Sequence, residues 1–186
     1  MLILASKSPR RKELLSLITT DFTVCLADVD EALPEGISPK DAVLYLSGIK
    51  ARAVSNGADT VIGADTIVVL DGKILGKPAD DDEAFSMLRE LSGREHSVFT
   101  GVTIISKNGE RSFYRETKVK FCPLSDEEIR DYIRTGECGD KAGAYGIQGF
   151  GSRFVEGING DYFNVVGLPV SALYHELMRL DCLCEY

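Results

Sequence analysis

The sequence predicts an α/β fold of mixed α+β character, with a central mixed, twisted sheet flanked by helices. Two observations point to this class. Strand-like and helix-like segments alternate along the chain. Three dipeptides typical of tight turns, Asp71-Gly72, Asn108-Gly109 and Asn159-Gly160, favour antiparallel hairpins. No repeat or linker interrupts the 186 residues, so we expect one domain over residues 1–186, with a single core or with two lobes that share a sheet.

The N-terminal part of the chain predicts one strand followed by two helices. Residues 2–5 are a short apolar run typical of a strand. Ser8 and Pro9 are suited to the N-cap and first position of a helix, and the apolar spacing continues that helix to Ile18. A second Ser-Pro pair begins a helix over residues 39–55, which ends at an Asn-Gly pair.

The remaining elements follow from the same signals of period, capping and turn dipeptides. In chain order we expect strands over residues 61–70 and 73–75, a helix from Asp80 to Leu91, strands over 97–106 and 112–121, a helix from Ser125 to Arg134, a loop over 139–151, a hairpin of strands 153–158 and 161–166, and a final helix from Pro169 to Arg179. The loop over 139–151 reads GDKAGAYGIQGFG, and its five glycines exclude a regular helix or strand.

Composition narrows the class of function. The formal charge of −8 argues against general nucleic-acid binding, because contact with phosphate backbones needs a basic surface. No apolar stretch reaches membrane-spanning length, and the start of the chain is the reverse of a secretory signal, so we expect a cytoplasmic protein with no membrane partner. With two histidines in the chain, acid–base chemistry would fall to carboxylates or lysines. The cysteines lack zinc-site spacing and are expected to be reduced thiols: Cys25, Cys122, Cys138, Cys182 and Cys184.

The first candidate site is the turn Ser6-Lys7-Ser8-Pro9-Arg10-Arg11-Lys12, which places four cations at the start of a helix. Cations there oppose the helix macrodipole. A bound anion would reverse that cost, since backbone N–H groups, serine hydroxyls and arginines together form a phosphate cradle. The alternative is a solvated basic turn in an acidic protein.

The second candidate site is Asp65, in the middle of the apolar run VIGADTIVVL. A buried ionised carboxylate without partners costs several kcal/mol. Strand alternation places Asp65 on the face of Gly63 and Ile67, opposite Thr66, and we expect Gly63 to leave room there for a ligand or a metal. The alternative is a buried aspartate that is hydrogen-bonded to backbone.

Further candidates lie on lysines, an acidic pair and the glycine-rich loop. Lys50, on the polar side of the second helix, and Lys77 are suited to phosphate or are plain surface lysines. Asp30 and Glu31 suit a divalent cation or serve solubility. The loop matches neither a Rossmann nor a Walker motif. Its glycines permit close approach of backbone to a ligand, Tyr145 and Phe150 offer aromatic surface, and Gln148 suits a base edge; the alternative is a long surface loop.

Together these segments resemble the Maf family of nucleoside triphosphate pyrophosphatases. The matching segments occur in the family's order and are ASKSPRRKELL (5–15), VDE (29–31), IKARAV (49–54), GADTIVVLDGKILGKP (63–78), LSGREHSVFTGV (91–102), DKAGAYGIQGFG (140–151) and INGDYFNVVGLP (158–169). The motifs S-P-R-R, G-A-D-T and A-G-A-Y-G-I-Q-G resemble the branch that acts on dTTP and UTP, rather than the branch that acts on 7-methyl-GTP. One departure is Cys138-Gly139, where the family often has a proline, and it affects loop stiffness.

The resemblance implies two lobes with a substrate cleft between them and a hydrolase of the α–β phosphoanhydride bond, which releases a nucleoside monophosphate and pyrophosphate. By motif, Asp65 activates the attacking water; Arg10, Thr66 and Gln148 set specificity; Glu31 and Asp65 hold Mg²⁺ or Mn²⁺. The residues implied to bind the triphosphate are Ser6, Arg11, Lys50 and Lys77. Such chemistry needs cations to spread charge and a base near water.

The resemblance leaves alternatives open. Modified pyrimidine nucleotides are further candidate substrates, and a role in excluding non-standard nucleotides or in cell division is compatible with the family. A non-catalytic nucleotide-binding regulator of septum formation and a purine-directed hydrolase of similar architecture are the competing hypotheses. For assembly, a homodimer is one alternative.

Overall fold

The computed structural model describes residues 1–183, in which strands and helices alternate as expected. The elements in chain order are β1 (Leu2–Ala5), α1 (Pro9–Leu15), β2 (Thr23–Cys25), α2 (Pro39–Val54), β3 (Thr60–Leu70), β4 (Lys73–Leu75), α3 (Asp81–Leu91), β5 (Glu95–Ser106), β6 (Gly109–Phe121), α4 (Asp126–Ile133), the 3₁₀ turns η1 (Ala142–Ala144) and η2 (Phe150–Phe154), β7 (Val155–Asn159), α5 (Tyr162–Val166) and α6 (Val170–Arg179). None of the helices within residues 1–183 is long and apolar enough to cross a membrane.

The strands form one mixed sheet with the order β2-β1-β3-β5-β6-β7, and β4 pairs with β3. β1 is parallel to both β2 and β3, whereas β4 is antiparallel to β3 and β7 is antiparallel to β6. Asp71 and Gly72 adopt φ values of 50° and 79° in the turn between β3 and β4, as a tight hairpin requires. The predicted fold class is therefore confirmed.

The chain divides into two compact units. The first unit comprises residues 1–65, 100–115 and the segment from 167, and the second comprises residues 66–99 and 116–166. Strands β3, β5 and β6 each contribute residues to both units.

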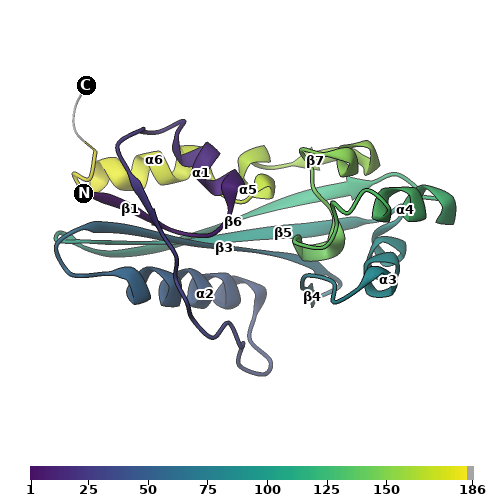
Figure 1. The fold of residues 1–186 in the computed structure, drawn as a ribbon, viewed down its shortest axis with the longest axis horizontal. Coiled ribbons are helices and arrows are strands. Elements are labelled where there is room, and N and C mark those ends of the chain that lie inside the picture. The colour runs from purple at the N-terminus through teal and green to yellow at the C-terminus, as the bar shows by residue number, and fades with distance from the viewer. Residues whose placement is uncertain (184–186) are drawn as a thin grey trace. The chain divides into compact units, whose positions relative to one another are not determined.

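In the first unit, α2 covers one face of the strands, and α1 and α6 lie on the other face (Figure 1). Glycines bring α2 directly onto the sheet. A Cβ atom at Gly63 would lie 2.2 Å from the Ser47 carbonyl oxygen, and one at Gly101 would lie 2.3 Å from the Val43 carbonyl oxygen. The expectation that Gly63 leaves room for a ligand or a metal is therefore wrong, because the backbone of α2 fills that space.

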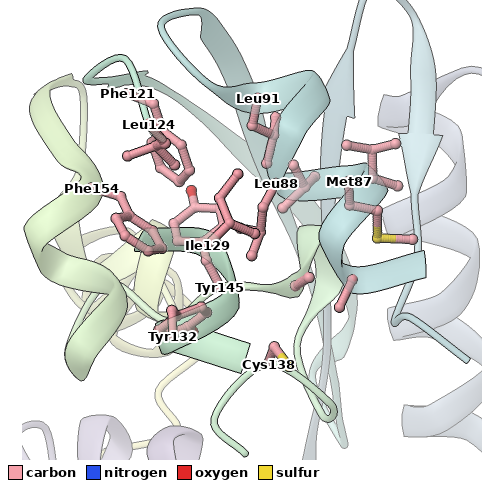
Figure 2. Packing of buried hydrophobic residues seen from close by; sticks show 14 of the residues in the cluster. Met87, Leu88, Leu91, Phe121, Leu124, Ile129, Tyr132, Cys138, Tyr145 and Phe154 are labelled. Carbon is pink, nitrogen blue, oxygen red and sulfur yellow. The ribbon is translucent and has the colours of Figure 1, made fainter. Parts of the chain in front are cut away.

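The second unit has its own hydrophobic core between α3, α4 and the strands, and Figure 2 shows its buried side chains. Phe121, Tyr145 and His96 meet edge to face, with ring centroids 4.7–5.4 Å apart. Tyr145 is only 5% exposed, so the expectation that it offers aromatic surface is wrong, whereas Phe150 is 61% exposed. The glycine-rich loop places this tyrosine in the core, which anchors the loop from inside.

Two predicted elements differ from the structure. The first helix ends at Leu15, and Ile18 is buried in the turn that follows. The predicted third hairpin is wrong, because residues 162–166 form helix α5 after β7. Asp161 begins this helix: its side chain accepts a hydrogen bond from the Phe163 backbone N–H (2.8 Å), and its own N–H donates to the Thr117 hydroxyl (3.0 Å). The Asn-Gly turn signal is therefore real, but a helix follows it instead of a return strand.

The cysteine thiols of the described residues are free. Cys138 is buried, Cys122 and Cys182 are partly exposed, and Cys25 is exposed. Cys184 lies outside the described residues.

Candidate functional site

The turn between β1 and α1 is organised by two serines around Arg11. The Ser6 hydroxyl accepts hydrogen bonds from the Ser8 backbone N–H (3.2 Å) and from Arg11 Nη1 (3.4 Å). The Ser8 hydroxyl caps the helix by accepting from the Arg11 backbone N–H (3.4 Å). Arg11 Nε donates to the Gly167 carbonyl oxygen at 2.9 Å. Hydrogen bonds therefore hold both the backbone N–H and the guanidinium of Arg11, unlike the cation of a merely solvated turn.

Asp65 is paired with a lysine from the helix that packs against its strand. Lys50 Nζ lies 2.5 Å from Asp65 Oδ1 and 3.1 Å from Glu31 Oε1. Lys50 is 9% exposed and Asp65 is 8% exposed, whereas the Glu31 side chain is 54% exposed. Placing Lys50 on the polar side of α2 is wrong, since its side chain is buried towards β3. A buried charge pair of this kind is tolerated because each charge compensates the other.

The Arg11 turn and the Lys50 cluster are electrostatically coupled within the first unit. Burial lowers the pKa of the Arg11 guanidinium, and the carboxylates of Asp65 and Glu31 act in the opposite direction. The positive charge of Arg10 lowers this pKa further. Arg10, Arg11 and Lys50 thus provide three cations against two carboxylates. The excess of positive charge suits an anionic ligand.

The carboxylates of this cluster are chemically suited to a divalent metal. No group of three or more His, Cys, Asp or Glu side chains comes together as a metal site within residues 1–183. Glu31 and Asp65 nevertheless converge on one cation, the Lys50 ammonium. Mg²⁺ is commonly held by one or two carboxylates and completes its shell with water and substrate phosphates, so this pair fits such an ion.

The other predicted site residues belong to the second unit. Thr66 follows Asp65 in β3, Lys77 is exposed after β4, and Gln148 is exposed in the glycine-rich loop. The segments that carry them contact one another within this unit. The Gly143 N–H donates to the Gly76 carbonyl oxygen at 3.0 Å, and a Cβ atom at Gly143 would lie 2.9 Å from the Val68 side chain. Gly143 has a φ of 68°, a conformation that favours glycine.

Sequence reasoning missed two residues that shape this unit. His96 is 3% exposed, and its Nε2 lies 2.8 Å from the Tyr145 hydroxyl. Glu137 accepts hydrogen bonds from the backbone of the glycine-rich loop. For Glu137, the signal in the sequence is an acidic residue two positions before the glycine-rich loop.

Comparisons with known proteins found relatives that match nearly the whole chain. The family model described as "Maf-like protein" matches residues 1–180. A dTTP/UTP pyrophosphatase of Geobacillus sp. (strain WCH70) is 55% identical over 181 residues, which cover 96% of this chain and 97% of that protein. A dTTP/UTP pyrophosphatase of Bacillus cereus (strain G9842) is 50% identical over 182 residues, with 97% and 95% covered. A solved structure of a HAM1 protein from Coxiella burnetii shares the fold at 14% identity, with a TM-score of 0.51 over 96% of this chain and 98% of that chain.

Proposed function

Because this chain belongs to the Maf family of proteins, we propose that it is a nucleotide pyrophosphatase that hydrolyses dTTP and UTP to the nucleoside monophosphate and pyrophosphate. The relatives that match nearly the whole chain at 50–55% identity are named for this activity. The observation that carries the proposal is the buried pair of Lys50 and Asp65, coupled to the fixed cation Arg11. This arrangement supplies both the carboxylate base and the positive charge that phosphoryl transfer needs.

In this proposal Asp65 accepts the proton of the attacking water. Lys50 holds the carboxylate in place and balances its charge from 2.5 Å. The triphosphate is bound by the Ser6 hydroxyl and by three cations, Arg11, Lys50 and Lys77. The positive charges stabilise the oxygens that gain negative charge as the α–β bond breaks. Arg11 is suited to this role because its bonds to Ser6 and Gly167 hold it in position before substrate binds.

Glu31 and Asp65 would hold the divalent cation, Mg²⁺ or Mn²⁺. When bound, the ion would orient the triphosphate and neutralise part of its charge. Lys50 contacts both carboxylates and offsets part of their negative charge.

Base selection is assigned to Arg10, Thr66 and Gln148. Gln148 offers one acceptor and one donor group, which complement a pyrimidine edge. The same residues would admit modified pyrimidine nucleotides, and through these substrates the enzyme would keep non-standard nucleotides out of nucleic acid. A role in septum formation remains a further proposal, and nothing in the comparisons favours a purely non-catalytic regulator.

The test is to incubate the purified protein and the Asp65→Asn variant with each nucleoside triphosphate and Mg²⁺, and to resolve the products by ion-exchange chromatography. We expect monophosphate and pyrophosphate from dTTP and UTP, and a loss of about a hundredfold or more in the variant. Release of orthophosphate and a diphosphate would contradict the proposal, as would a preference for dGTP or ITP. A division phenotype that persists with Asp65→Asn would favour regulation by binding.

A further inference from the structure

The part of the glycine-rich loop that carries Gln148 is folded around one carboxylate. Glu137 Oε2 accepts a hydrogen bond from the Phe150 backbone N–H at 2.7 Å, and Oε1 accepts from the Gly151 N–H at 3.3 Å. The Tyr132 hydroxyl donates to Oε1 at 3.1 Å. Successive backbone N–H groups that converge on one anion form a nest, and such bonds are stronger than those between neutral groups. Here the anion belongs to the chain itself.

Two glycines of the loop are explained by their contact with this carboxylate. A Cβ atom at Gly149 would lie 2.1 Å from Glu137 Oε2, and one at Gly146 would lie 2.9 Å from Oε1. A Cβ atom at either position would push the carboxylate of Glu137 away from its hydrogen-bond donors, so glycine lets the backbone close around Glu137. The glycines that the sequence suggested for close approach to a ligand thus approach a side chain of the protein.

Further contacts fix Glu137 and Tyr132. Lys141 Nζ donates to the Glu137 carbonyl oxygen at 2.6 Å, and the Gly146 N–H donates to the Tyr132 hydroxyl at 3.2 Å. Burial and the Glu137 carboxylate raise the pKa of Tyr132, which keeps this phenol protonated as a donor. Tyr132 itself is fully buried in the core of the second unit (Figure 2). The anchor is therefore tied to a rigid part of the fold.

We propose that Glu137 is a positioning residue for Gln148 and so determines base selection. Gly146 on one side of Gln148 and Phe150 on the other are held by the Glu137–Tyr132 pair, whereas Gln148 itself is exposed at the tip between them. Fixing both flanks limits the directions in which the amide of Gln148 can point. This inference rests on the proposed function, because it takes Gln148 as the residue that contacts the base.

The test is a double-mutant cycle of Glu137→Gln and Gln148→Ala, measured by calorimetry with the non-hydrolysable α,β-methylene analogues of dTTP and dGTP. Glu137→Gln keeps the shape of the side chain but replaces one acceptor oxygen with a donor that faces a backbone N–H. We expect each single variant to reduce the ratio of the two affinities by about tenfold, and the double variant to reduce it no further, since both act through one amide. Glu156→Gln, an exposed glutamate of the same unit, is the matched control and should leave the ratio unchanged.

A second readout reports the anchor without any nucleotide. Amide hydrogen exchange at Phe150 and Gly151 should accelerate by about tenfold or more in Glu137→Gln and remain unchanged in Glu156→Gln. Tyr132→Phe keeps the ring but removes the hydroxyl that donates to Glu137 and accepts from Gly146. It should shift both readouts in the same direction by a smaller factor, and it replaces Glu137→Gln if that variant does not fold.

The outcomes separate this inference from the proposed function. The positioning role would be overturned if Glu137→Gln had the same ratio of affinities as the wild type, or if the effects of the two substitutions multiplied independently. It would also be overturned if the wild-type protein bound neither analogue. Selective binding and the expected cycle without any release of pyrophosphate from dTTP would instead overturn the proposed hydrolysis and leave the positioning role standing.

Discussion

Substituting Gly63 with alanine tests whether close packing of α2 on β3 holds Lys50 and Asp65, the proposed catalytic pair, together. The added Cβ would lie 2.2 Å from the Ser47 carbonyl oxygen, 2.7 Å from the Ala51 nitrogen and 2.9 Å from the Ala51 Cβ. All three atoms belong to α2, and two are backbone, so no rotation of a side chain relieves the overlap. Cβ atoms in proteins essentially never lie closer than 3.0 Å to such an atom, and the added Cβ would lie at 2.2 Å. Helix α2 must therefore move away from β3 by about 0.8 Å, the difference between these two distances.

This displacement acts directly on the proposed site, because Lys50 lies between Ser47 and Ala51 on the same helix. Moving α2 by that amount stretches the 2.5 Å contact between Lys50 Nζ and Asp65 Oδ1 to about 3.3 Å, which weakens this hydrogen bond and shifts the lysine relative to the carboxylate. Overpacking of a core costs roughly 1–3 kcal/mol. A misplacement of about 1 Å in a catalytic group costs up to roughly a hundredfold in rate. We therefore expect Gly63→Ala to lose about 2 kcal/mol of stability and about 10- to 100-fold in kcat/KM for dTTP.

The stability assay is urea unfolding monitored by fluorescence. The activity assay is the release of pyrophosphate from dTTP with Mg²⁺. Gly157→Ala is the matched control, since nothing lies within 4 Å of the added Cβ, and it should change stability by less than about 0.5 kcal/mol. A Gly63→Ala variant with wild-type stability and activity would contradict this prediction, because it would mean that α2 adjusts without moving Lys50.

Two further predictions follow from the charges of the structure. Lys50→Met leaves the buried Asp65 without its cation and should lower the free energy of unfolding, measured in urea, by about 3 kcal/mol. Glu31→Gln changes a side chain that is 54% exposed and should lower it by less than about 1 kcal/mol. Equal losses in the two variants would contradict the importance of the buried pair. Burial lowers the pKa of His96 to about 4, so the unfolded chain takes up its proton first and stability falls as the pH drops from about 6.5 to about 4, by up to roughly 3 kcal/mol. The measurement is the urea midpoint of unfolding at pH 7 and at pH 4.5. The midpoint should fall between these pH values in the wild type and in His175→Asn, the control at an exposed histidine, but not in His96→Phe. A fall in His96→Phe as large as in the wild type would contradict this prediction.

Lys50 and Tyr145 are both buried, although the local sequence pattern predicts a surface position for each. Both were assigned to surfaces, one as the polar side of a helix and the other as part of a glycine-rich loop. Lys50 is buried because Asp65, fifteen residues away in the chain, supplies its counter-charge. Tyr145 is buried because His96 on β5 meets its hydroxyl at 2.8 Å. Neither partner is visible in the local sequence, since both contacts depend on which strand lies beneath.

What the sequence determined by itself was local. Ser8, Asp80 and Ser125 cap helices by accepting from backbone N–H groups three residues on, and Asp71-Gly72 makes the predicted turn, because these interactions are completed within a few residues. Only the tertiary structure decided that α2 fills the space beside Gly63, that Lys50 compensates Asp65, and that the glycine-rich loop closes around Glu137. These contacts join segments that are distant in sequence or depend on the exact path of a loop. Their energies come from close packing and from charge compensation away from water, which no local pattern encodes.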